Sequence, residues 1–573
     1  MKQLDWIVLL ITLSSIIVYG IYKSRTSKDL DGYFLSNRNL PWYVILLSIM
    51  GTQASAVTFL SAPGQAYTDG MRFVQYYFGL PIAAIVICIS FVPVFTKLKV
   101  FTAYEFLENR FDLKTRSFTS FLFLLQRGLS TGISVFAPSI ILSVLMGWNI
   151  YITILFIGGF LIIYTVAGGA QAVAHTQKVQ FLIIMAAMFL AGYYVVKELP
   201  ENIGFSEALT IGGKLGKFNV ITTGFEKGSF DWGDRYNLFS GIIGGFFLAL
   251  SYFGTDQSQV GRYITGKNVK ESRLGLLMNG IVKVPMQFLI LLIGVLVFAF
   301  YQFNSAPAFF NNYELNRLEN SEYKNEITVL QQKLSSIDAE KAVVLAEYGQ
   351  DGSEQALTHM HQLQVRTDSV RTAIKGLVKQ NNGQDNDTNY IFLRFVMDYL
   401  PVGLVGLIIA VIFMASWGSI AAALNSLASS TMIDFHKRFS KKERSDKHYY
   451  RYSQLYTLLW GIFCILVAMF ASNWGNSLIE VVNILGSLFY GTILGIFLVA
   501  FYAKNVKGNA VFIAALIAEA LVILLFFLNE YKIISLGFLW LNAVGALAVW
   551  GISIVLQKFM PEQNKPHRSI GGA

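Results

Sequence analysis

Apolar runs of about twenty residues recur along the whole chain and alternate with short polar loops. A run of about 20 residues crosses the ~30 Å hydrocarbon core of a bilayer as an α-helix. The pattern predicts about thirteen such helices, which makes the chain an all-α polytopic membrane protein. We expect them near residues 4–22, 42–68, 73–96, 117–145, 149–167, 177–197, 236–263, 275–302, 392–435, 452–472, 477–502, 509–528 and 533–557.

Two of these runs contain polar groups and helix breakers. The second run includes the stretch GTQASAVTFLSAPGQAY with Gly51, Pro63 and Gly64, and the seventh run, SGIIGGFFLALSYFG, has a glycine cluster at 241–245. Irregular backbone in a membrane is found where it lines a cavity or is buried in protein. Broken helices at matching positions of two repeats mark the binding site of an inverted-repeat transporter. We therefore expect breaks in both runs, with close packing through small residues as the alternative.

The ninth run is rich in small and hydroxyl residues, as in MASWGSIAAALNSLASSTMIDF. Hydroxyls, together with carbonyls freed by a break in a neighbouring helix, supply the oxygen ligands that a hard cation such as Na⁺ prefers. The same hydroxyls equally fit packing positions at which serine bonds the backbone of its own helix. The pattern thus leaves a cation site and a packing role open.

Lysine and arginine gather in every second loop. The loops after the first, third, seventh and ninth runs are basic, and the last of them reads HKRFSKKERSDKHYYR. The alternate short loops TDGMRF, MGWN and SNWGNS hold no basic residue except Arg72. Because basic loops stay on the cytoplasmic side, we expect the N-terminus outside, the C-terminus in the cytoplasm, and a multi-pass protein of the plasma or inner membrane.

A polar block at 304–390 separates the eighth and ninth runs. Its apolar residues recur with helical spacing from Tyr323 to Tyr348 and from Ala356 to Leu377, interrupted at Lys341. Two amphipathic helices joined by GQDGSE predict an antiparallel hairpin outside the membrane, which would project ~50 Å if it stood upright. A solvated spacer or lid and a docking surface for another protein both remain open.

These features divide the chain into segments whose boundaries are predictions. They are an N-terminal helix and loop at 1–41, a first repeat at 42–200, an outer loop at 201–235, the start of a second repeat at 236–303, the hairpin insert at 304–390, the rest of the second repeat at 391–503, and two C-terminal helices with a tail at 504–573.

Composition agrees with a transporter. The 573 residues are 54% hydrophobic and 14% charged, against about 25% charged in a typical soluble protein. Basic loops explain the net charge of +10 without nucleic acid, so we expect membrane lipid and a small-molecule solute as partners. The chain has no GxSxG, HExxH or phosphate-cradling motif, and His436 and His448 lie in an expected cytoplasmic loop. We do not expect an enzyme.

Several long blocks, in the expected order, resemble the sodium/solute symporter family and most closely its iodide, multivitamin and monocarboxylate branch. They are SAVTFLSAPGQAY, VPVFTKLKVFTAYEFLENRF, STGISVFAPSIIL, YTVAGGAQAVAHTQKVQ, ALSYFGTDQSQVGRY and LNSLASSTMIDF. The resemblance covers all predicted spans and leaves out the insert. It implies a five-plus-five inverted-repeat (LeuT-like) core with an extra N-terminal helix, and Na⁺-driven uptake by alternating access.

The resemblance also implies a principal sodium site made of backbone carbonyls and hydroxyls. Its positions correspond to Gly51, Ala54, Ala415, Gly418 and Ser419. Ser419 keeps its hydroxyl, whereas Gly418 has none. The second sodium site of some members would lie where the expected oxygens are missing, at Gln177, Ala421 and Ala422. Because an alanine methyl group cannot ligate a hard cation, we expect Na⁺ as the co-transported ion, with at most one per cycle.

For the solute, the resemblance implies contacts on the broken helices and on the third and fourth spans. The candidates are Gln53, Thr58, Phe59, Gln75, Tyr76, Arg127, Ser130 and Phe253. Arg127 is unusual because an intramembrane arginine is rare and faces the bundle interior. It would bind a substrate carboxylate or replace the charge of the second sodium, and snorkelling or structural pairing is the alternative. Lys283 lies nearer a loop and is expected to be interfacial.

The working hypothesis is a sodium-coupled symporter that imports a small polar solute, such as a monocarboxylate or a vitamin-like acid. A symporter of a sugar or another neutral solute is the first alternative. The others are a sodium-independent or proton-coupled transporter and a membrane sensor that uses the same fold. No motif in the chain identifies the solute, because fold-level likeness does not determine the ligand.

Overall fold

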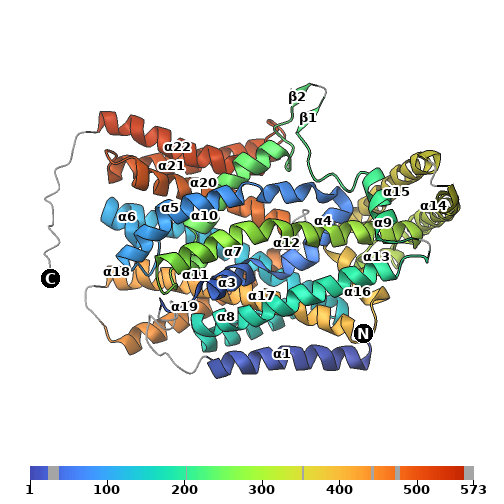
Figure 1. The fold of residues 1–573 in the computed structure, drawn as a ribbon, viewed down its shortest axis with the longest axis horizontal. Helices are drawn as coiled ribbons and strands as arrows, with labels where there is room; N and C mark the ends of the chain where they lie inside the picture. The colour runs from blue at the N-terminus through green and yellow to red at the C-terminus, as the bar shows by residue number, and fades with distance from the viewer. Residues whose placement is uncertain are drawn as a thin grey trace.

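The computed structural model describes residues 1–23, 38–201, 203–226, 228–351, 354–440, 444–471 and 478–560. Most of its helices run along the long axis of the molecule (Figure 1). Among the described residues the one sheet is a short antiparallel pair, β1 (Phe225–Glu226) and β2 (Ser229–Phe230). The predicted all-α class is therefore confirmed.

The helices are numbered in the order in which they follow one another along the chain. They are α1 (Gln3–Lys23), α3 (Trp42–Gln53), α4 (Ala56–Asp69), η2 (Met71–Tyr77), α5 (Leu80–Leu98), α6 (Glu105–Arg110), α7 (Leu113–Met146), α8 (Ile150–Lys197), α9 (Phe205–Lys214), η3 (Ser240–Gly244), α10 (Gly245–Gly254), α11 (Gln257–Tyr263), α12 (Val269–Phe303), α13 (Asn312–Glu319), α14 (Lys324–Asp351), α15 (Glu354–Gln380), η4 (Thr388–Tyr390), α16 (Ile391–Tyr399), α17 (Leu404–Ser430), η5 (Thr431–His436), α18 (Lys437–Phe439), α19 (Asp446–Ala471), α20 (Leu478–Tyr502), α21 (Gly508–Glu530) and α22 (Phe538–Phe559).

Nine helices of the described chain are long and apolar enough to cross a membrane, and the bent pair α3–α4 makes a tenth candidate. The remaining predicted spans correspond to shorter apolar helices at Gln3–Ile16, Ile150–Val166 and Ser240–Gly254. The predicted spans at 149–167 and 177–197 both lie in α8. Tyr164 Oη and Thr176 Oγ1, twelve residues apart, are separated by 3.3 Å, whereas a straight helix would place their backbones ~18 Å apart. The helix therefore turns back between these two residues.

The first predicted break is present and lies between α3 and α4, which meet at 63°. Ala54 and Ser55 form the break. Pro63 and Gly64, which the sequence suggested as breakers, lie inside α4 instead. Gly64 has a different role, because a Cβ there would lie 1.9 Å from the carbonyl oxygen of Thr388. This close approach holds α4 against η4.

The second break is present but is not where the glycine cluster predicted it. The chain stays helical through η3 and α10, and the helix ends at Thr255 and Asp256, before α11 begins. Gly241 and Gly245 allow close packing. A Cβ on Gly241 would lie 2.1 Å from the carbonyl oxygen of Gln75, and a Cβ on Gly245 would lie 2.6 Å from that of Tyr76. The expectation that these glycines break the helix was wrong, and small-residue packing explains them.

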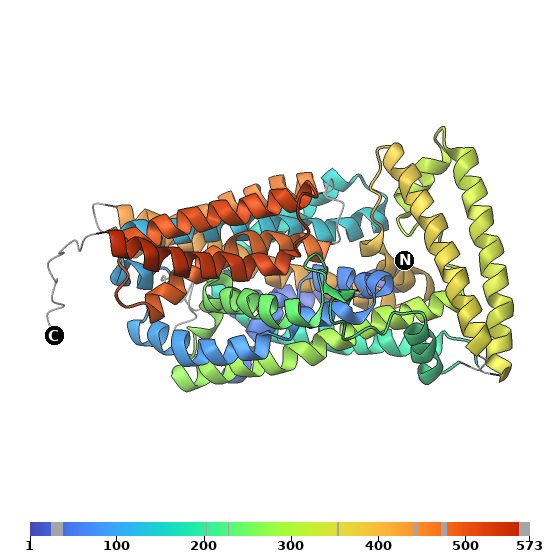
Figure 2. The same cartoon turned by 90° about the horizontal axis from the view of Figure 1, so that it is seen from above.

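The helices α14 and α15 form the predicted hairpin, but it does not stand upright. Figure 2 shows both helices lying across one end of the bundle, roughly at right angles to its long axis. Apolar residues of the hairpin, including Ile337, Val344 and Met360, pack against Ile211 of α9 and Phe298 of α12. The expected projection of ~50 Å is wrong, because burial of this apolar face holds the hairpin flat.

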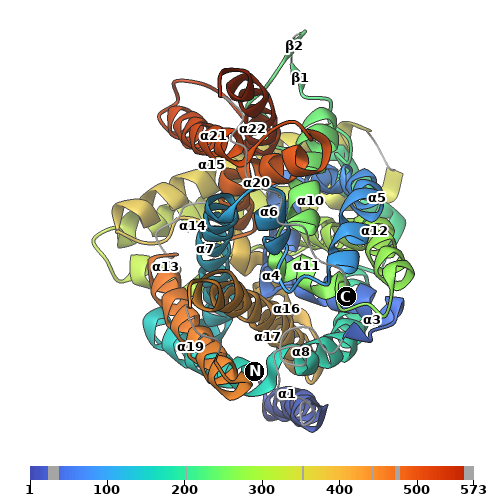
Figure 3. The same ribbon diagram turned by 90° about the vertical axis from the view of Figure 1, so that its left-hand side faces the viewer.

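The two ends of the bundle differ in chemistry. One end, which we call the hairpin end, carries α14 and α15 and the N-terminal end of α1 (Figure 1). The opposite end, which we call the basic end, carries α6 and α18 with Arg110, Lys437 and Arg438. Along the long axis (Figure 3), α4 and α11 lie near the middle, with α1 at one edge and α21 and α22 at the opposite edge. The loop 24–37, used above for orientation, lies outside the described residues.

Candidate functional site

A cavity of about 130 Å³ lies beside the break between α3 and α4. Eight elements contribute to it: α3, α4, η2, α5, α7, α10, α12 and α20. Its lining residues are Gln53, Ser55, Val57, Thr58, Tyr76, Tyr77, Leu80, Gln126, Arg127, Ser134, Gly245, Leu248, Ala249, Tyr252, Phe253, Lys283, Ile479, Val482, Asn483, Gly486 and Tyr490. The walls are therefore aromatic and aliphatic, with a few polar groups between them, as in many small-molecule sites.

Arg127 enters this cavity from α7 and pairs with a carboxylate in the second break. Its guanidinium donates to Asp256 Oδ2 and, at 2.8 Å, to Tyr490 Oη. Tyr490 Oη in turn donates to Asp256 Oδ2 at 2.8 Å. Asp256 also caps α11, because its Oδ1 accepts from Ser258 N at 2.8 Å. The buried arginine is thus compensated, and the pair links α7, α20 and the break between α10 and α11.

Lys283 is the second cation of the cavity, and it has no such compensation. Its side chain on α12 is buried, with 2% of the residue exposed. Nζ lies 5.4 Å from the centroid of the Tyr77 ring, a cation–π contact. Among the described residues, no carboxylate forms an ion pair with Lys283. The expected interfacial position is wrong, and the ammonium group faces the cavity.

Neutral polar groups surround these two cations. Gln53 donates to Asn279 Oδ1 at 2.9 Å, and Tyr76 Oη donates to Asn483 Oδ1 at 3.1 Å. Within the described part of the chain, the amide nitrogens of Asn279 and Asn483 are buried and have no hydrogen-bond partner. Buried amide donors without partners are uncommon in folded proteins. Of the two, Asn483 lines the cavity, so its amide is placed to donate to a polar solute there.

The structure brings five of the eight predicted solute contacts to the cavity. They are Gln53, Thr58, Tyr76, Arg127 and Phe253. The other three, Phe59, Gln75 and Ser130, are fully or almost fully buried elsewhere. The Gln75 amide, for example, donates to Thr222 Oγ1 at 2.9 Å and to Tyr236 O at 3.1 Å. The amide of Gln75 is therefore bonded to the segment that precedes η3 and does not reach the cavity.

Asp256 and Asn483 were not predicted as site residues. Asp256 had a local signal, since an aspartate followed by a glutamine three residues later, Gln259, is typical of a helix N-terminus. Asn483 had none, because it is one polar residue near the start of a long apolar helix.

The break in the second span frees two backbone carbonyls. In an unbroken helix Ser55 N and Thr58 N would donate to Gly51 O and Ala54 O. Instead, Ser55 N donates to Gln53 O at 3.0 Å and Thr58 N donates to Ser55 O at 3.0 Å. The carbonyl oxygens of Gly51 and Ala54 therefore lack their helical donors. These are the two oxygens of this span that the sequence assigns to a sodium site.

Gln177 of α8 connects this break to α17. Its Nε2 donates to Gly418 O at 3.0 Å and to Thr52 Oγ1 at 3.2 Å, and its Oε1 accepts from Ser48 at 2.9 Å. A neutral amide thus holds α3, α8 and α17 together at the position expected for an acidic sodium ligand. Ala421 and Ala422 are fully buried and pack against Tyr164.

Two predicted sodium ligands of α17 are buried in the same region. Ala415 is 2% exposed, and the Ser419 hydroxyl donates to the carbonyl of Ser416 at 3.1 Å. A hydroxyl that donates to its own helix still presents its lone pairs to a cation, so the role of Ser419 as a sodium ligand, like that of Ala415, stays a prediction.

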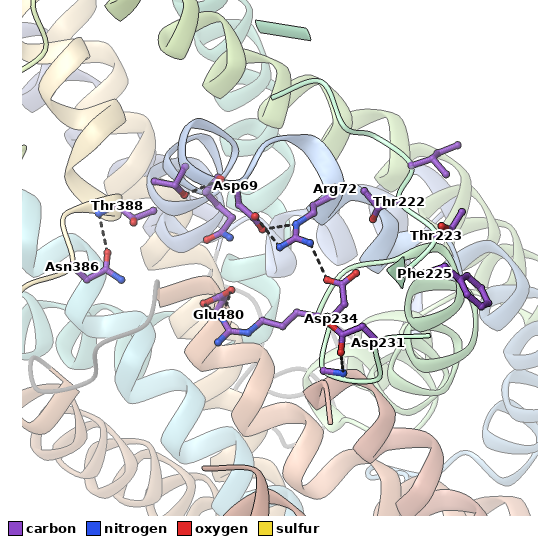
Figure 4. A pocket seen from close by; sticks show the side chains of 16 residues that line it. Asp69, Arg72, Thr222, Thr223, Phe225, Asp231, Asp234, Asn386, Thr388 and Glu480 are labelled. Atoms are coloured by element: carbon purple, nitrogen blue, oxygen red, sulfur yellow. Dashed lines mark hydrogen bonds and ion pairs between the residues drawn. The ribbon is translucent and has the colours of Figure 1, made fainter. Parts of the chain in front are cut away.

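Above the cavity, toward the hairpin end, lies a larger vestibule of about 860 Å³ (Figure 4). Arg72 pairs with Asp69 and Asp234, each at 2.9 Å, and Arg235 pairs with Glu480 at 3.0 Å. Glu480 lines the vestibule and Asn483, one turn later in α20, lines the cavity, so the two spaces adjoin along this helix. The vestibule has a charged rim through which a solute would approach from this side.

A second ionic network closes the basic end. Arg116 of α7 contacts Asp434 of η5 at 2.7 Å and Glu108 of α6 at 2.9 Å. Asp434 also accepts from Thr102 at 2.7 Å and Ser120 at 3.0 Å. The hydrogen bond from Arg438 lowers the pKa of Glu108, which keeps this carboxylate charged. These contacts hold the end of α17 and η5 against α6 and α7.

The profile of the sodium:solute symporter family matches residues 33–323 and 370–518. This match covers more than half of the chain. The chain belongs to the sodium:solute symporter family. The unmatched residues between the two blocks fall within the hairpin, which agrees with an insertion. Membership confirms the predicted family, its sodium coupling and a small-molecule solute, and it makes the protein a multi-pass membrane transporter.

Named relatives include members of the predicted branch. The human sodium/iodide cotransporter is 28% identical over 276 residues, which is 48% of this chain and 41% of that protein. A sodium/sialic acid symporter of Proteus mirabilis is 25% identical over 557 residues, 95% of this chain and 93% of that protein. A solved outward-open, substrate-bound structure of a Na⁺-coupled sialic acid symporter superposes with a TM-score of 0.74, at 22% identity and 98% coverage of both chains. That likeness shows the fold.

Proposed function

We propose that this sodium symporter imports a small organic anion, such as a monocarboxylate or a vitamin-like acid. The observation that carries the proposal is the buried ammonium group of Lys283, which faces the cavity without a carboxylate partner among the described residues. A buried charge is costly unless it is paired. A negatively charged solute would supply the missing partner.

The charges around the cavity support a monoanion. Lys283 and Arg127 contribute two positive charges, and Asp256, bound to Arg127, contributes one negative charge. When Lys283 is protonated, the net charge is positive by one unit, which a single carboxylate neutralises. Arg127 remains within the cavity wall, so a carboxylate would be able to contact both cations. A neutral sugar would leave Lys283 uncompensated.

The size of the cavity supports a compact solute. Its volume of about 130 Å³ resembles that of an engineered protein cavity of ~150 Å³ that binds benzene. The aliphatic and aromatic side chains Leu248, Tyr252, Phe253 and Ile479 would cover an apolar body, while the anionic group lies near Lys283. Iodide and sialic acid, which name two of the relatives, are also anions.

We infer that at most one Na⁺ accompanies the solute. The ligands would be the carbonyls of Gly51, Ala54 and Ala415 and the hydroxyl of Ser419, with water replacing the missing hydroxyl at Gly418. Gln177 already donates to Gly418 O and Thr52, and Ala421 and Ala422 offer methyl groups. A second cation would therefore find no carboxylate at these positions.

The proposed orientation places the hairpin end outside and the basic end in the cytoplasm, in the plasma or inner membrane. In this orientation the vestibule opens to the outside. The hairpin is then an outer lid or spacer, and binding of a protein partner to its exposed face remains the other proposed role.

Uptake into proteoliposomes tests the proposal directly. A panel of labelled short monocarboxylates and vitamin-like acids, with glucose as a neutral comparison, would be presented with an inward Na⁺ gradient. We expect at least one acid to accumulate and glucose to be excluded. Lys283→Met should abolish that uptake, whereas Lys267→Met, in an exposed loop, should not. Accumulation of glucose alone would contradict an anionic solute, and uptake that persists without Na⁺ would contradict the coupling.

A further inference from the structure

Two histidines meet at the basic end, away from the solute cavity. His436 is the last residue of η5, and His448 lies in the first turn of α19. Their Nε2 atoms are 3.3 Å apart. The two residues belong to different helices joined by a loop, so the fold and not helical periodicity brings them together.

Both imidazole rings are held in place by tyrosines of α19. The Nδ1 of His436 is hydrogen-bonded to Tyr456 Oη at 2.7 Å. The ring of Tyr452 lies against both histidines, with centroid distances of 4.3 Å to His448 and 4.9 Å to His436. When Nδ1–H of His436 donates to Tyr456, its Nε2 lone pair faces His448. A hydrogen bond to the distal ring nitrogen is the usual support of a metal-binding histidine.

The separation of the two nitrogens fits a shared metal ion. The nitrogen pair at 3.3 Å is within reach of a hydrogen bond when one of the two facing nitrogens is protonated, and the same separation suits a shared ion when neither is. Two metal–nitrogen bonds of 2.0–2.1 Å at a tetrahedral angle place the nitrogens about 3.4 Å apart. Imidazole nitrogen is a good ligand for Zn²⁺, Cu²⁺ and Ni²⁺. The two rings are thus set at the spacing that such an ion requires.

Two neighbouring cations have other contacts, whereas the charge of Arg444 lies within electrostatic range of His436. Lys437 lies over the ring of Tyr449, with 5.6 Å between Nζ and the ring centroid. Arg438 forms an ion pair with Glu108. Both contacts draw these positive groups toward partners other than the histidine pair.

We propose that His436 and His448 form a binding site for a divalent transition metal of the Zn²⁺ class, with water in the remaining positions. Two protein ligands bind more weakly than the three or four of catalytic and structural zinc sites, so the ion is exchangeable. Its effect is to fasten η5 to α19. Because η5 continues α17, which carries Ala415 and Ser419, metal binding restrains the helix that bears the proposed sodium ligands.

Metal titration of the purified full-length protein, carrying no histidine tag, tests this site. Isothermal calorimetry with ZnCl₂ should give one site per chain, and zinc should raise the melting temperature. His436→Asn and His448→Asn should each weaken binding at least tenfold, and Tyr456→Phe should weaken it several-fold. His359→Asn, in the hairpin, is the matched control and should bind as the unaltered protein does.

Zinc X-ray absorption on the unaltered protein gives a second readout that does not depend on any variant folding. Two imidazole nitrogens at about 2.0 Å are expected in the first shell. Unchanged affinity in both histidine variants, or a first shell without two imidazoles, would overturn the proposal. The absence of binding up to millimolar zinc would do the same.

Discussion

The side-chain amide of Gln177 donates a hydrogen bond to the carbonyl oxygen of Gly418, with 3.0 Å between the two atoms. The neutral amide of Gln177 thus lies beside the proposed sodium site, at the position where an acidic ligand for a second cation was expected. Gly418 itself contributes no side-chain oxygen. The affinity of this transporter for Na⁺ should accordingly depend on how many oxygens of α17 remain.

Gly418→Ser should tighten sodium binding and Ser419→Ala should weaken it. The added Cβ at Gly418 would lie 2.8 Å from Gln180 Oε1, the flexible end of a side chain, so it is accommodated by a small shift. One oxygen contact to a charged group is worth ~1.5 kcal/mol, or about tenfold in affinity. Binding of ²²Na⁺ to the purified protein measures both effects without knowledge of the solute.

Ser426→Ala is the matched control, because the Ser426 hydroxyl also donates to its own helix, to Ala422 O at 2.9 Å. Its sodium affinity should equal that of the unaltered protein. An unchanged affinity in Ser419→Ala would remove Ser419 from the sodium site.

Asp256→Asn should destabilise the protein by ~3–5 kcal/mol, because it leaves the buried guanidinium of Arg127 without its carboxylate. Arg127→Gln alone should be similarly costly. The double variant Arg127→Gln/Asp256→Asn should recover a large part of the loss, since neither charge remains. Thermal unfolding in detergent measures the cycle.

Tyr490→Phe provides the comparison for this pair, because it removes the hydrogen bonds of the Tyr490 hydroxyl to Asp256 and Arg127 while both charges stay. We expect a loss of ~1–2 kcal/mol. Additive losses in the double variant would show that Arg127 and Asp256 do not stabilise one another.

Asp5→Ala should loosen α1 from the bundle. The carboxylate of Asp5 accepts from Gly403 N at 2.6 Å and Gly406 N at 3.3 Å, and so caps the first turn of α17 from a neighbouring helix. A charged cap at a helix N-terminus is worth ~1 kcal/mol. Hydrogen exchange of α1 and of residues 403–407 should increase.

The exposed Asp446 in the first turn of α19 serves as the control. Asp446→Ala should leave exchange in α1 unchanged. Equal exchange in the Asp5 variant and the unaltered protein would mean that apolar contacts alone hold α1.

The stability of the hairpin should rise between about pH 8 and pH 10. Lys341 is buried between the hairpin and α12, where its Nζ donates to Gln302 at 3.2 Å. Burial lowers the pKa of Lys341 to about 8, against ~10.4 in an unfolded chain. The unfolded hairpin therefore binds more protons in this interval, and raising the pH favours the folded form.

Limited proteolysis of the hairpin at several pH values checks this expectation. Lys341→Met should remove the pH dependence in this range, whereas Lys333→Met, at an exposed hairpin position, should retain it. A Lys341 variant with the same pH profile as the unaltered protein would exclude this lysine as the cause.

The membrane fold was largely predictable because its signals are local. Apolar runs of membrane length, basic loops and the 4-3 spacing of the insert each follow from neighbouring residues. The orientation of the hairpin was not predictable, because it depends on contacts with Ile211 and Phe298, which lie far away in the sequence.

The candidate site was predictable only in part. Gln53, Thr58 and Tyr76 were found because they belong to an interrupted span or to the helix that follows it. Lys283 was misjudged because α12 is apolar on most faces, so its sequence does not show which face meets the cavity. The second break was predicted in the wrong place because glycine occurs both where a helix breaks and where two helices pack closely. Only the position of the neighbouring helix distinguishes these two cases.

The contact between Gly64 and Thr388 has a practical consequence. With no space for even a methyl group between them, a tilt of α4 toward η4 would displace the segment that follows the hairpin. A change at the break, deep in the bundle, would thus be transmitted to a surface that a fluorescent label can reach. A label on an exposed residue of the hairpin next to this segment would therefore be the place to look for movement of α4 during transport.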